Sequence, residues 1–257
     1  AWLIAMAFML SRGFIKTGLG RRIALVFVRN FGHRSLGLAY SIMGIDLVTS
    51  PAIPSNTARA GGVVYPIVKS LAETYGSDPK KGTRKKIGSF LVFSEFHSNL
   101  ITSATFMTAM APNLVIVALA KTLHINITWL GWFVAGVLPS VICLIATPYI
   151  IYKMYPPEIK ETPNAKEWAD KELKDMGSMK LSEKLMGLIF ILTLILWMLT
   201  SFVPAIDATF VAFLAIALLL ITGVLETKDI LKETGAWNVL IWLSVLVYMA
   251  NQLSELG

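Results

Sequence analysis

Pro54-Ser55-Asn56-Thr57-Ala58-Arg59-Ala60-Gly61-Gly62 places small hydrogen-bonding side chains and one guanidinium between apolar segments of a 257-residue chain. The composition around this stretch is that of a membrane protein, because 55% of the residues are hydrophobic, 15% are charged and the mean hydropathy is +0.66. Polar groups at membrane depth are costly and are usually functional. The fold and function of the chain are therefore interpreted outward from this stretch.

Apolar runs predict where the chain crosses the membrane. The runs 185–202 and 208–225 are each near the roughly 20 residues that span a bilayer as a helix. Further candidates are residues 2–10, 87–120 with polar interruptions, 129–154 and the stretch from Trp237 onward. Neither end of the chain resembles a natural terminus, so we expect a fragment of a longer carrier. The predicted fold class is all-α, a polytopic membrane protein.

The basic residues predict the topology. If the loop after residues 2–10 is cytoplasmic and the segment around Ser55 enters and leaves from that same face, all but Lys121 and Arg59 of the 23 lysines and arginines fall on cytoplasmic segments. This is the arrangement that the positive-inside rule favours. A complete crossing at Ser55 would place the later basic loops outside. The sequence therefore predicts a re-entrant hairpin with Ser55 at its tip.

The tip has the chemistry of an anion site. Pro51 and Pro54 end the entering arm, and Ser55, Asn56 and Thr57 are good N-cap residues for the helix that follows. A helix that begins near Ala58 would aim its positive dipole end at the tip, which favours a carboxylate. The alternative is that these residues only cap a buried helix.

A second polar interruption runs from Phe93 through His97 to Pro112 and Asn113. Pro112 would break the helix and free carbonyl groups of the preceding turn, and these groups, with hydroxyls such as that of Thr108, suit a small cation or a substrate carboxylate. The alternative is a proline kink whose freed carbonyls are capped by the threonines. Discontinuous helices in a membrane protein point to a transport site.

A weak internal repeat and the loop composition predict the organisation of the chain. Trp2 and Trp237 begin similar segments that the topology orients in opposite directions, as in an inverted-repeat transporter. We divide the chain into five parts. Residues 1–39 form a membrane helix and a cytoplasmic interfacial arm helix, which are scaffold and linker, and residues 40–122 form a re-entrant hairpin and a broken helix, which are half of the transport domain. Residues 123–154 form a membrane helix, residues 155–184 a solvated cytoplasmic connector between the repeats, and residues 185–257 the scaffold helices that begin the second repeat.

With these motifs, the chain resembles the divalent-anion/sodium symporter family, and within it the branch of exchangers for 2-oxoglutarate, malate, citrate and succinate. The resemblance rests on Ser55-Asn56-Thr57-Ala58 before Gly-Gly, on the threonine-rich break that ends in Pro112-Asn113, and on the repeat. It implies a homodimer in the plasma membrane of a bacterial cell, with a transport domain that moves like an elevator. It also implies that Ser55, Asn56 and Thr57 hold one substrate carboxylate, and that a second Ser-Asn-Thr motif, absent from this sequence, holds the other.

Arg59 and His97 depart from what sodium-coupled members of that family require. A guanidinium stays protonated and cannot leave, so near the site it would repel sodium and supply a fixed positive charge. We therefore expect that Arg59, with His97, replaces the cation and that transport is sodium-independent exchange. The alternative function is sodium-coupled symport of the same substrates. The alternatives for the two side chains are a salt bridge or a snorkelling arginine, and a core histidine.

Other functions are less well supported. Glu95 and His97, with Asp46, could hold a metal, but no His-Glu-x-x-His or Gly-x-Ser-x-Gly pattern occurs, so we expect no enzyme, metal or cofactor, and sodium only under symport. Cys143 is the single cysteine and excludes an internal disulfide. The net charge of +7 follows the membrane topology rather than indicating nucleic acid. The expected partners are dicarboxylates and the lipid bilayer.

Overall fold

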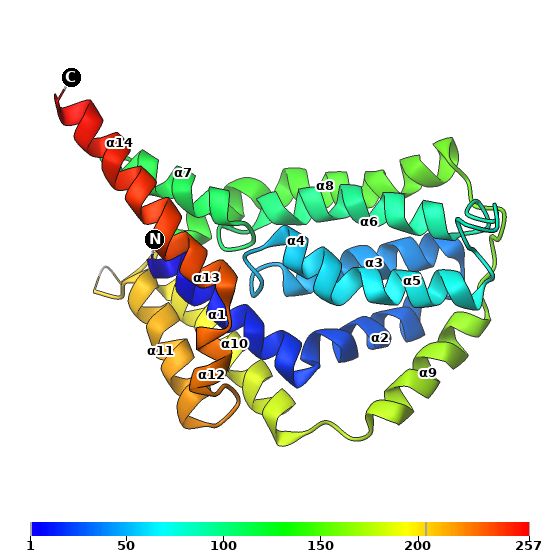
Figure 1. Cartoon of the computed structure of the whole chain (residues 1–257). Coiled ribbons are helices and arrows are strands. Elements are labelled where there is room, and N and C mark those ends of the chain that lie inside the picture. The colour runs from blue at the N-terminus through cyan, green and yellow to red at the C-terminus, as the bar shows by residue number, and fades with distance from the viewer. Residues whose placement is uncertain (1, 204, 257) are drawn as a thin grey trace.

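The computed structural model describes residues 2–203 and 205–256, and every secondary-structure element in these ranges is helical, as predicted. Figure 1 shows two groups of helices joined by long connections. Two helices, α8 (Trp129–Met154) and α10 (Leu181–Leu199), are long and apolar enough to cross a membrane, and the bent pair of α1 (Trp2–Thr17) and α2 (Leu19–Phe31) has the composition of a third span.

The re-entrant hairpin consists of α3 (Ser35–Thr49), the tip, and a returning helix formed by α4 (Asn56–Arg59), the π-helix η1 (Ala60–Val64) and α5 (Tyr65–Thr74). At 1.5 Å per residue α3 is about 22 Å long, which is less than the roughly 30 Å of a hydrocarbon core. Figure 1 shows α4 at the end of the hairpin that is far from the loops flanking it, and α3 contacts the returning helix at η1.

The two ends of the hairpin lie on the same side of the molecule. The Ser35 backbone N–H donates to the Lys160 carbonyl oxygen at 3.0 Å, and the Glu158 N–H donates to the Lys85 carbonyl oxygen at 3.1 Å. The segment after α8 therefore joins the start of α3 to the loop that follows α5. This is the arrangement that the distribution of basic residues predicted.

The predicted broken helix is also present. α6 (Gly88–Thr105) ends, residues 106–110 form an irregular turn, and α7 (Ala111–Thr122) begins with Pro112 in its first turn. α8 packs along α6, and the Trp132 indole Nε1–H donates to the Ala104 carbonyl oxygen at 2.9 Å near the break. The hairpin, α6 and α8 together form what we call the hairpin body.

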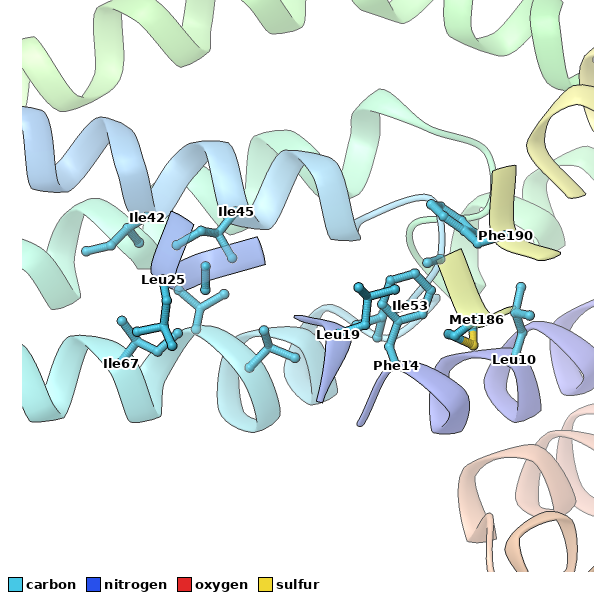
Figure 2. Packing of buried hydrophobic residues seen from close by; sticks show 14 of the residues in the cluster. Leu10, Phe14, Leu19, Leu25, Ile42, Ile45, Ile53, Ile67, Met186 and Phe190 are labelled. Atoms are coloured by element: carbon cyan, nitrogen blue, oxygen red, sulfur yellow. The ribbon is translucent and has the colours of Figure 1, made fainter. Parts of the chain in front are cut away.

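The arm helix α2 follows α1 after a bend of 64° at Gly18, whose φ of 78° lies in the left-handed region. Its apolar face, however, packs against protein: Figure 2 shows Leu25 between Ile42 and Ile45 of α3 and Ile67 of α5. The expectation of a helix lying on the membrane surface is thus modified, because the hairpin covers the apolar side of α2.

The connector 155–184 is more ordered than the sequence suggested. It contains α9 (Asn164–Met176), whose Ala165 and Ala169 are fully buried, and α9 packs against α2. Arg21 of α2 forms an ion pair with Glu172 of α9. The charged residues that indicated a solvated linker therefore partly serve to attach α9 to the arm.

The remaining helices form what we call the outer bundle. It contains α1, α10, α11 (Ala208–Ile221), α12 (Thr227–Leu231) and α13 (Thr234–Asn238), and the chain continues through the π-helix η2 (Val239–Leu243) into α14 (Ser244–Leu256). Phe14 and Phe190 meet edge to face with ring centroids 5.0 Å apart, close to Leu10 and Met186 (Figure 2). α1 contacts α13, and the two run in opposite directions (Figure 1), as expected for the two Trp-led segments.

Candidate functional site

The hairpin tip is a self-capped helix start. The Ser55 hydroxyl oxygen accepts the Ala58 backbone N–H at 3.1 Å, and the Asn56 carbonyl Oδ1 accepts the Thr57 N–H at 2.9 Å. Ser55 and Asn56 are half-buried and Thr57 is exposed. The capping role weighed from the sequence is present, and it leaves polar side chains of the tip within reach of a ligand.

Arg59 lies one turn beyond the tip and is fully buried. Its Nε donates to Asp46 Oδ1 at 2.7 Å, so the salt bridge considered as an alternative is present. One terminal nitrogen, Nη1, donates to the Ile53 carbonyl oxygen at 2.9 Å and to the Ala109 carbonyl oxygen at 3.0 Å. The guanidinium therefore connects the hairpin tip to the break between α6 and α7.

The other terminal nitrogen of Arg59 completes the network. Nη2 donates to Ser103 Oγ at 2.9 Å and to Thr102 Oγ1 at 3.3 Å, and Thr102 in turn donates to Asp46. Asn99 Nδ2 donates to Asp46 Oδ1 at 3.1 Å and lies 3.4 Å from the Asn56 carbonyl oxygen. α6 thus supplies three side chains to a network that begins at the tip.

Sequence reasoning missed the role of Asp46, which it named only as a possible metal ligand. A carboxylate in an apolar helix 13 residues before a membrane arginine was the available signal, because buried charges in membranes usually pair. Asn99, Thr102 and Ser103 were recognised as a polar interruption but not as partners of Arg59. Their i, i+3 and i+4 spacing places them on one helix face.

The predicted binding residues of the break are occupied by internal contacts. The Asn113 amide Nδ2 donates to the carbonyl oxygens of Ser103 at 2.7 Å and Phe106 at 3.1 Å, and Pro112 is exposed at the start of α7. The Thr108 hydroxyl donates to the Pro51 carbonyl oxygen at 3.0 Å. Asn113 and Thr108 therefore shape the break and hold it against the hairpin.

His97 does not join Arg59. Its Nδ1 lies 2.9 Å from the Phe93 carbonyl oxygen, and its ring contacts those of Phe93 and Phe96. At about 100° per residue, position 97 is turned roughly 200° from Asn99, which belongs to the network, and so His97 faces away from it. The expectation that His97 shares a cation-like role with Arg59 finds no contact in the structure.

The structure also bears on metals and cavities. Among the described residues, no group of three or more His, Cys, Asp or Glu side chains could hold a metal ion. A cavity of about 900 Å³ lies beside α7 and the turn between α10 and α11. Ser55, Asn56 and Thr57 do not line it. The tip therefore lies apart from this cavity.

Fold and site together define a membrane protein in which a re-entrant hairpin and a broken helix pack around a buried polar network. The chain belongs to the family described as the sodium:sulfate symporter transmembrane region, whose model matches residues 1–257. It is thus a multi-pass membrane protein of a transporter family.

Relatives of known name are similar over the whole chain. A Bacillus subtilis (strain 168) protein named "Putative malate transporter YflS" is 53% identical over 257 residues, which are 100% of this chain and 54% of that protein. The "Dicarboxylate transporter 2, chloroplastic" of Spinacia oleracea is 43% identical, over 100% of this chain and 46% of the relative. The "L-tartrate/succinate antiporter" of Escherichia coli (strain K12) is 39% identical, over 100% of this chain and 52% of the relative. The chain spans about half the length of these curated relatives.

Proposed function

We propose that the protein is a secondary transporter that moves dicarboxylates across the membrane by obligatory, sodium-independent exchange. The observation that carries this proposal is the hairpin tip, where Ser55 caps α4, Asn56 and Thr57 form its first turn, and α4 lies against α6 of the broken helix. The names of the relatives support the substrate class, and one of them is named an antiporter.

The tip offers suitable groups for a carboxylate. The hydroxyls of Ser55 and Thr57 and the amide of Asn56 can donate hydrogen bonds, and the helix that follows directs its positive end toward them. The Ser55 cap on Ala58 and the Asn56 cap on Thr57 keep these side chains at the tip. In this proposal Thr108, Pro112 and Asn113 act on the substrate through the shape of the break.

Arg59 supports a sodium-independent mechanism. Unwound backbone carbonyls near a broken helix are the groups that coordinate sodium in many transporters. Here the carbonyl oxygens of Ile53 and Ala109 accept from Arg59 Nη1. A cation that is part of the chain therefore occupies the groups that a sodium ion would use, and no cation has to bind or leave during a cycle.

Exchange follows from the cost of moving an empty tip. Because Asp46 neutralises Arg59, the charge that must be satisfied at the tip is the partial positive charge of the helix start, together with its hydroxyl and amide donors. Polar groups that enter a water-poor region without a partner are costly. A bound dianion satisfies these donors, so the loaded tip crosses more readily than the empty one.

The proposed movement is of the elevator type in a homodimer. Within the hairpin body, α3, η1 and α5 of the hairpin all pack on α6, while α1 leads into the arm α2 through the bend at Gly18. A glycine with positive φ is suited to such a connection because it adopts this conformation without strain. The arm would transmit the position of the hairpin body to the outer bundle.

Proteoliposomes that contain the full-length protein test the proposal. We expect labelled malate to enter vesicles loaded with unlabelled dicarboxylate, at the same rate in sodium and in choline buffers. Vesicles without internal dicarboxylate should take up almost none. Uptake into empty vesicles driven by a sodium gradient would support symport instead, and no movement of any dicarboxylate would refute the substrate class.

The role of Arg59 needs a variant that leaves no unpaired buried charge. Arg59→Thr combined with Asp46→Asn removes both charges and keeps polar groups at both positions. We expect this double variant to lose sodium-independent exchange or to become sodium-dependent. Arg21→Thr, on the arm, serves as the control and should exchange normally. A double variant with wild-type rates and no sodium dependence would contradict the role of Arg59.

A further inference from the structure

Glu95 is a buried carboxyl group that the proposed function does not use. It lies in the middle of α6 and is 5% exposed. Among the described residues, neither of its carboxyl oxygens has a hydrogen-bond partner, and the same holds for the buried hydroxyls of Ser94 and Ser98 on the same face. Buried polar groups are nearly always paired, so an unpaired carboxyl needs an explanation.

Glu95 is connected to the hairpin tip through α6. Asn99, one helical turn further on, contacts both Asp46 and the Asn56 carbonyl oxygen. α6 also packs directly against α4 and η1. Glu95 is therefore one helical turn, roughly 5 Å along the axis, from the residue of α6 that contacts the tip.

The charged groups around Glu95 are few. Asp46 of α3 and Arg59 of α4 act on it electrostatically. The other titratable groups of the helices packed on α6 are either exposed or in contact with other residues. On α5, Lys69 and Glu73 form an ion pair and Tyr65 is half exposed. On α8 and α3, Lys153 lies over the ring of Tyr149, Tyr152 packs on Phe90, Cys143 is exposed, and the Tyr40 hydroxyl donates to the Ile145 carbonyl oxygen. η1 has no titratable side chain.

The local charge balance depends on whether Glu95 holds a proton. Arg59 and Asp46 cancel each other, so an ionised Glu95 would leave one net negative charge buried without a donor. Such a charge is strongly disfavoured in a medium of low dielectric constant. A protonated Glu95 makes the group neutral, and a dianion at the tip then meets no like charge behind it.

A proton fits this site better than a sodium ion. Sodium sites in transporters draw on backbone carbonyls that are freed where helices unwind. Ser94, Glu95 and Ser98 lie within the uninterrupted helix 88–105, whose carbonyls are used by the helix itself. One carboxyl oxygen is sufficient to hold a proton.

We propose that Glu95 is a proton-binding site whose protonation favours the binding of a dicarboxylate dianion at the tip of the hairpin. The proposal rests on the function proposed above. Because linkage between two ligands is reciprocal, substrate binding must then favour proton uptake by Glu95. The carboxyl group would tie the transport of a dianion to pH without any metal ion.

The first test measures succinate affinity against pH in the purified full-length protein. Between about pH 7 and pH 10 succinate stays a dianion, because both of its carboxyl groups are already ionised at neutral pH. We expect affinity to fall as pH rises, by at most about tenfold per pH unit for one linked proton. Glu95→Gln, which imitates the protonated acid, should bind tightly at every pH. Glu73→Gln, an exposed acid on α5, is the control and should behave like wild type.

A second measurement detects the proton itself. Adding succinate to wild-type protein in weak buffer with a pH indicator should show proton uptake, which Glu95→Gln should lack. If Glu95→Gln does not fold, Glu95→Asp keeps an acid in place and should shift the pH at which affinity falls. An unchanged pH profile in either variant, or a sodium-dependent affinity in wild type without proton uptake, would overturn the proposal.

Failure of this proposal can be told apart from failure of the proposed function. If succinate binds and exchanges with no dependence on Glu95, only the proton site is refuted. If no dicarboxylate binds or moves, infrared spectra still test the site. The carbonyl band of a protonated carboxyl group should be present in wild type and absent in Glu95→Gln, and an identical band in both proteins refutes the assignment.

Discussion

The hairpin body and the outer bundle are both helical, but their centres have opposite chemistry. In the hairpin body, Arg59 and Asp46 are fully buried and bonded to one another. In the outer bundle, the centre is made of side chains such as Phe14 and Phe190, and the buried hydroxyl of Thr193 donates to the Ile189 carbonyl oxygen of its own helix. In the hairpin body, hydrogen bonds hold the hairpin tip against the break between α6 and α7. In the outer bundle, apolar contacts hold whole helices together.

This comparison explains where the molecule accepts the cost of burying charge. Helices in a membrane associate mainly through packing, so a polar centre is not needed for cohesion. The guanidinium of Arg59 instead bonds to carbonyl oxygens of the tip and of the break, which have no helical partner. The polar centre thus keeps irregular backbone satisfied at membrane depth.

The largest expected effect comes from removing one member of the buried pair. Asp46→Leu leaves Arg59 uncompensated and should lower the free energy of unfolding by about 3–5 kcal/mol. Thermal unfolding of the purified full-length protein in detergent measures this loss. Asp46→Leu combined with Arg59→Met should regain most of the stability but not transport. A single variant as stable as wild type would show that the pair is not buried.

A smaller effect is expected in the outer bundle, from overpacking. A side chain at Gly13 would collide with the Met186 sulfur atom, so Gly13→Val should cost about 1–3 kcal/mol. Adding Met186→Ala makes room and should restore part of the stability. Substrate affinity should stay unchanged in both variants, because the site lies in the other body. A clear loss of affinity would contradict this separation of the two bodies.

At the tip the expected effect on stability is smaller again. Ser55→Ala removes the cap on the Ala58 N–H and should cost about 0.5–2 kcal/mol. Because the same hydroxyl is proposed to bind substrate, affinity for succinate should fall as well. Thr128 also caps a helix, through the Gly131 N–H, so Thr128→Ala is the matched control that should lose stability alone. Equal affinities in the two variants would refute a binding role for Ser55.

The sequence predicted the outline of the hairpin body well, because the signals for it are local or additive. Counting lysines and arginines placed both ends of the hairpin on one side, and Pro112 located the break to within a few residues. Spans such as 129–154 were found with their boundaries because a long apolar helix leaves an unbroken pattern. These features depend on composition and on single residues.

The contacts inside the network could not be predicted in the same way. Asp46 and Arg59 meet only because the chain reverses at the tip, and linear spacing does not show which side chains face each other after a reversal. Helical periodicity places Glu95, Asn99 and Thr102 on one face of α6 and His97 on another, so the expected pairing of His97 with Arg59 remains a prediction that no contact in the structure supports. The packing of α9 on α2 depended on contacts between distant segments.

The smallest expected effect concerns the ion pair that ties α1 to the connection after α11. Lys16 Nζ donates to Asp229 Oδ2 at 2.6 Å, and the Glu226 N–H donates to the same oxygen at 2.9 Å. Burial raises the pKa of the Asp229 carboxyl, but the hydrogen bonds and the charge of Lys16 outweigh it and hold this pKa below its ordinary value.

The pH dependence of this pair follows from the direction of the Asp229 shift. A carboxyl whose pKa is lower in the folded than in the unfolded protein stabilises the fold above about pH 4 and loses that contribution as pH falls through the folded value. Asp229→Asn should therefore lower stability by at most about 1 kcal/mol at neutral pH, and the two proteins should converge in acid. Asp170→Asn is the control, because its carboxylate is half exposed and 4.0 Å from Arg29. If the loss of stability in Asp229→Asn is the same in acid as at neutral pH, the pair stabilises the protein through packing and not through charge. The buried charge of the hairpin body would then differ even more clearly from the rest of the molecule.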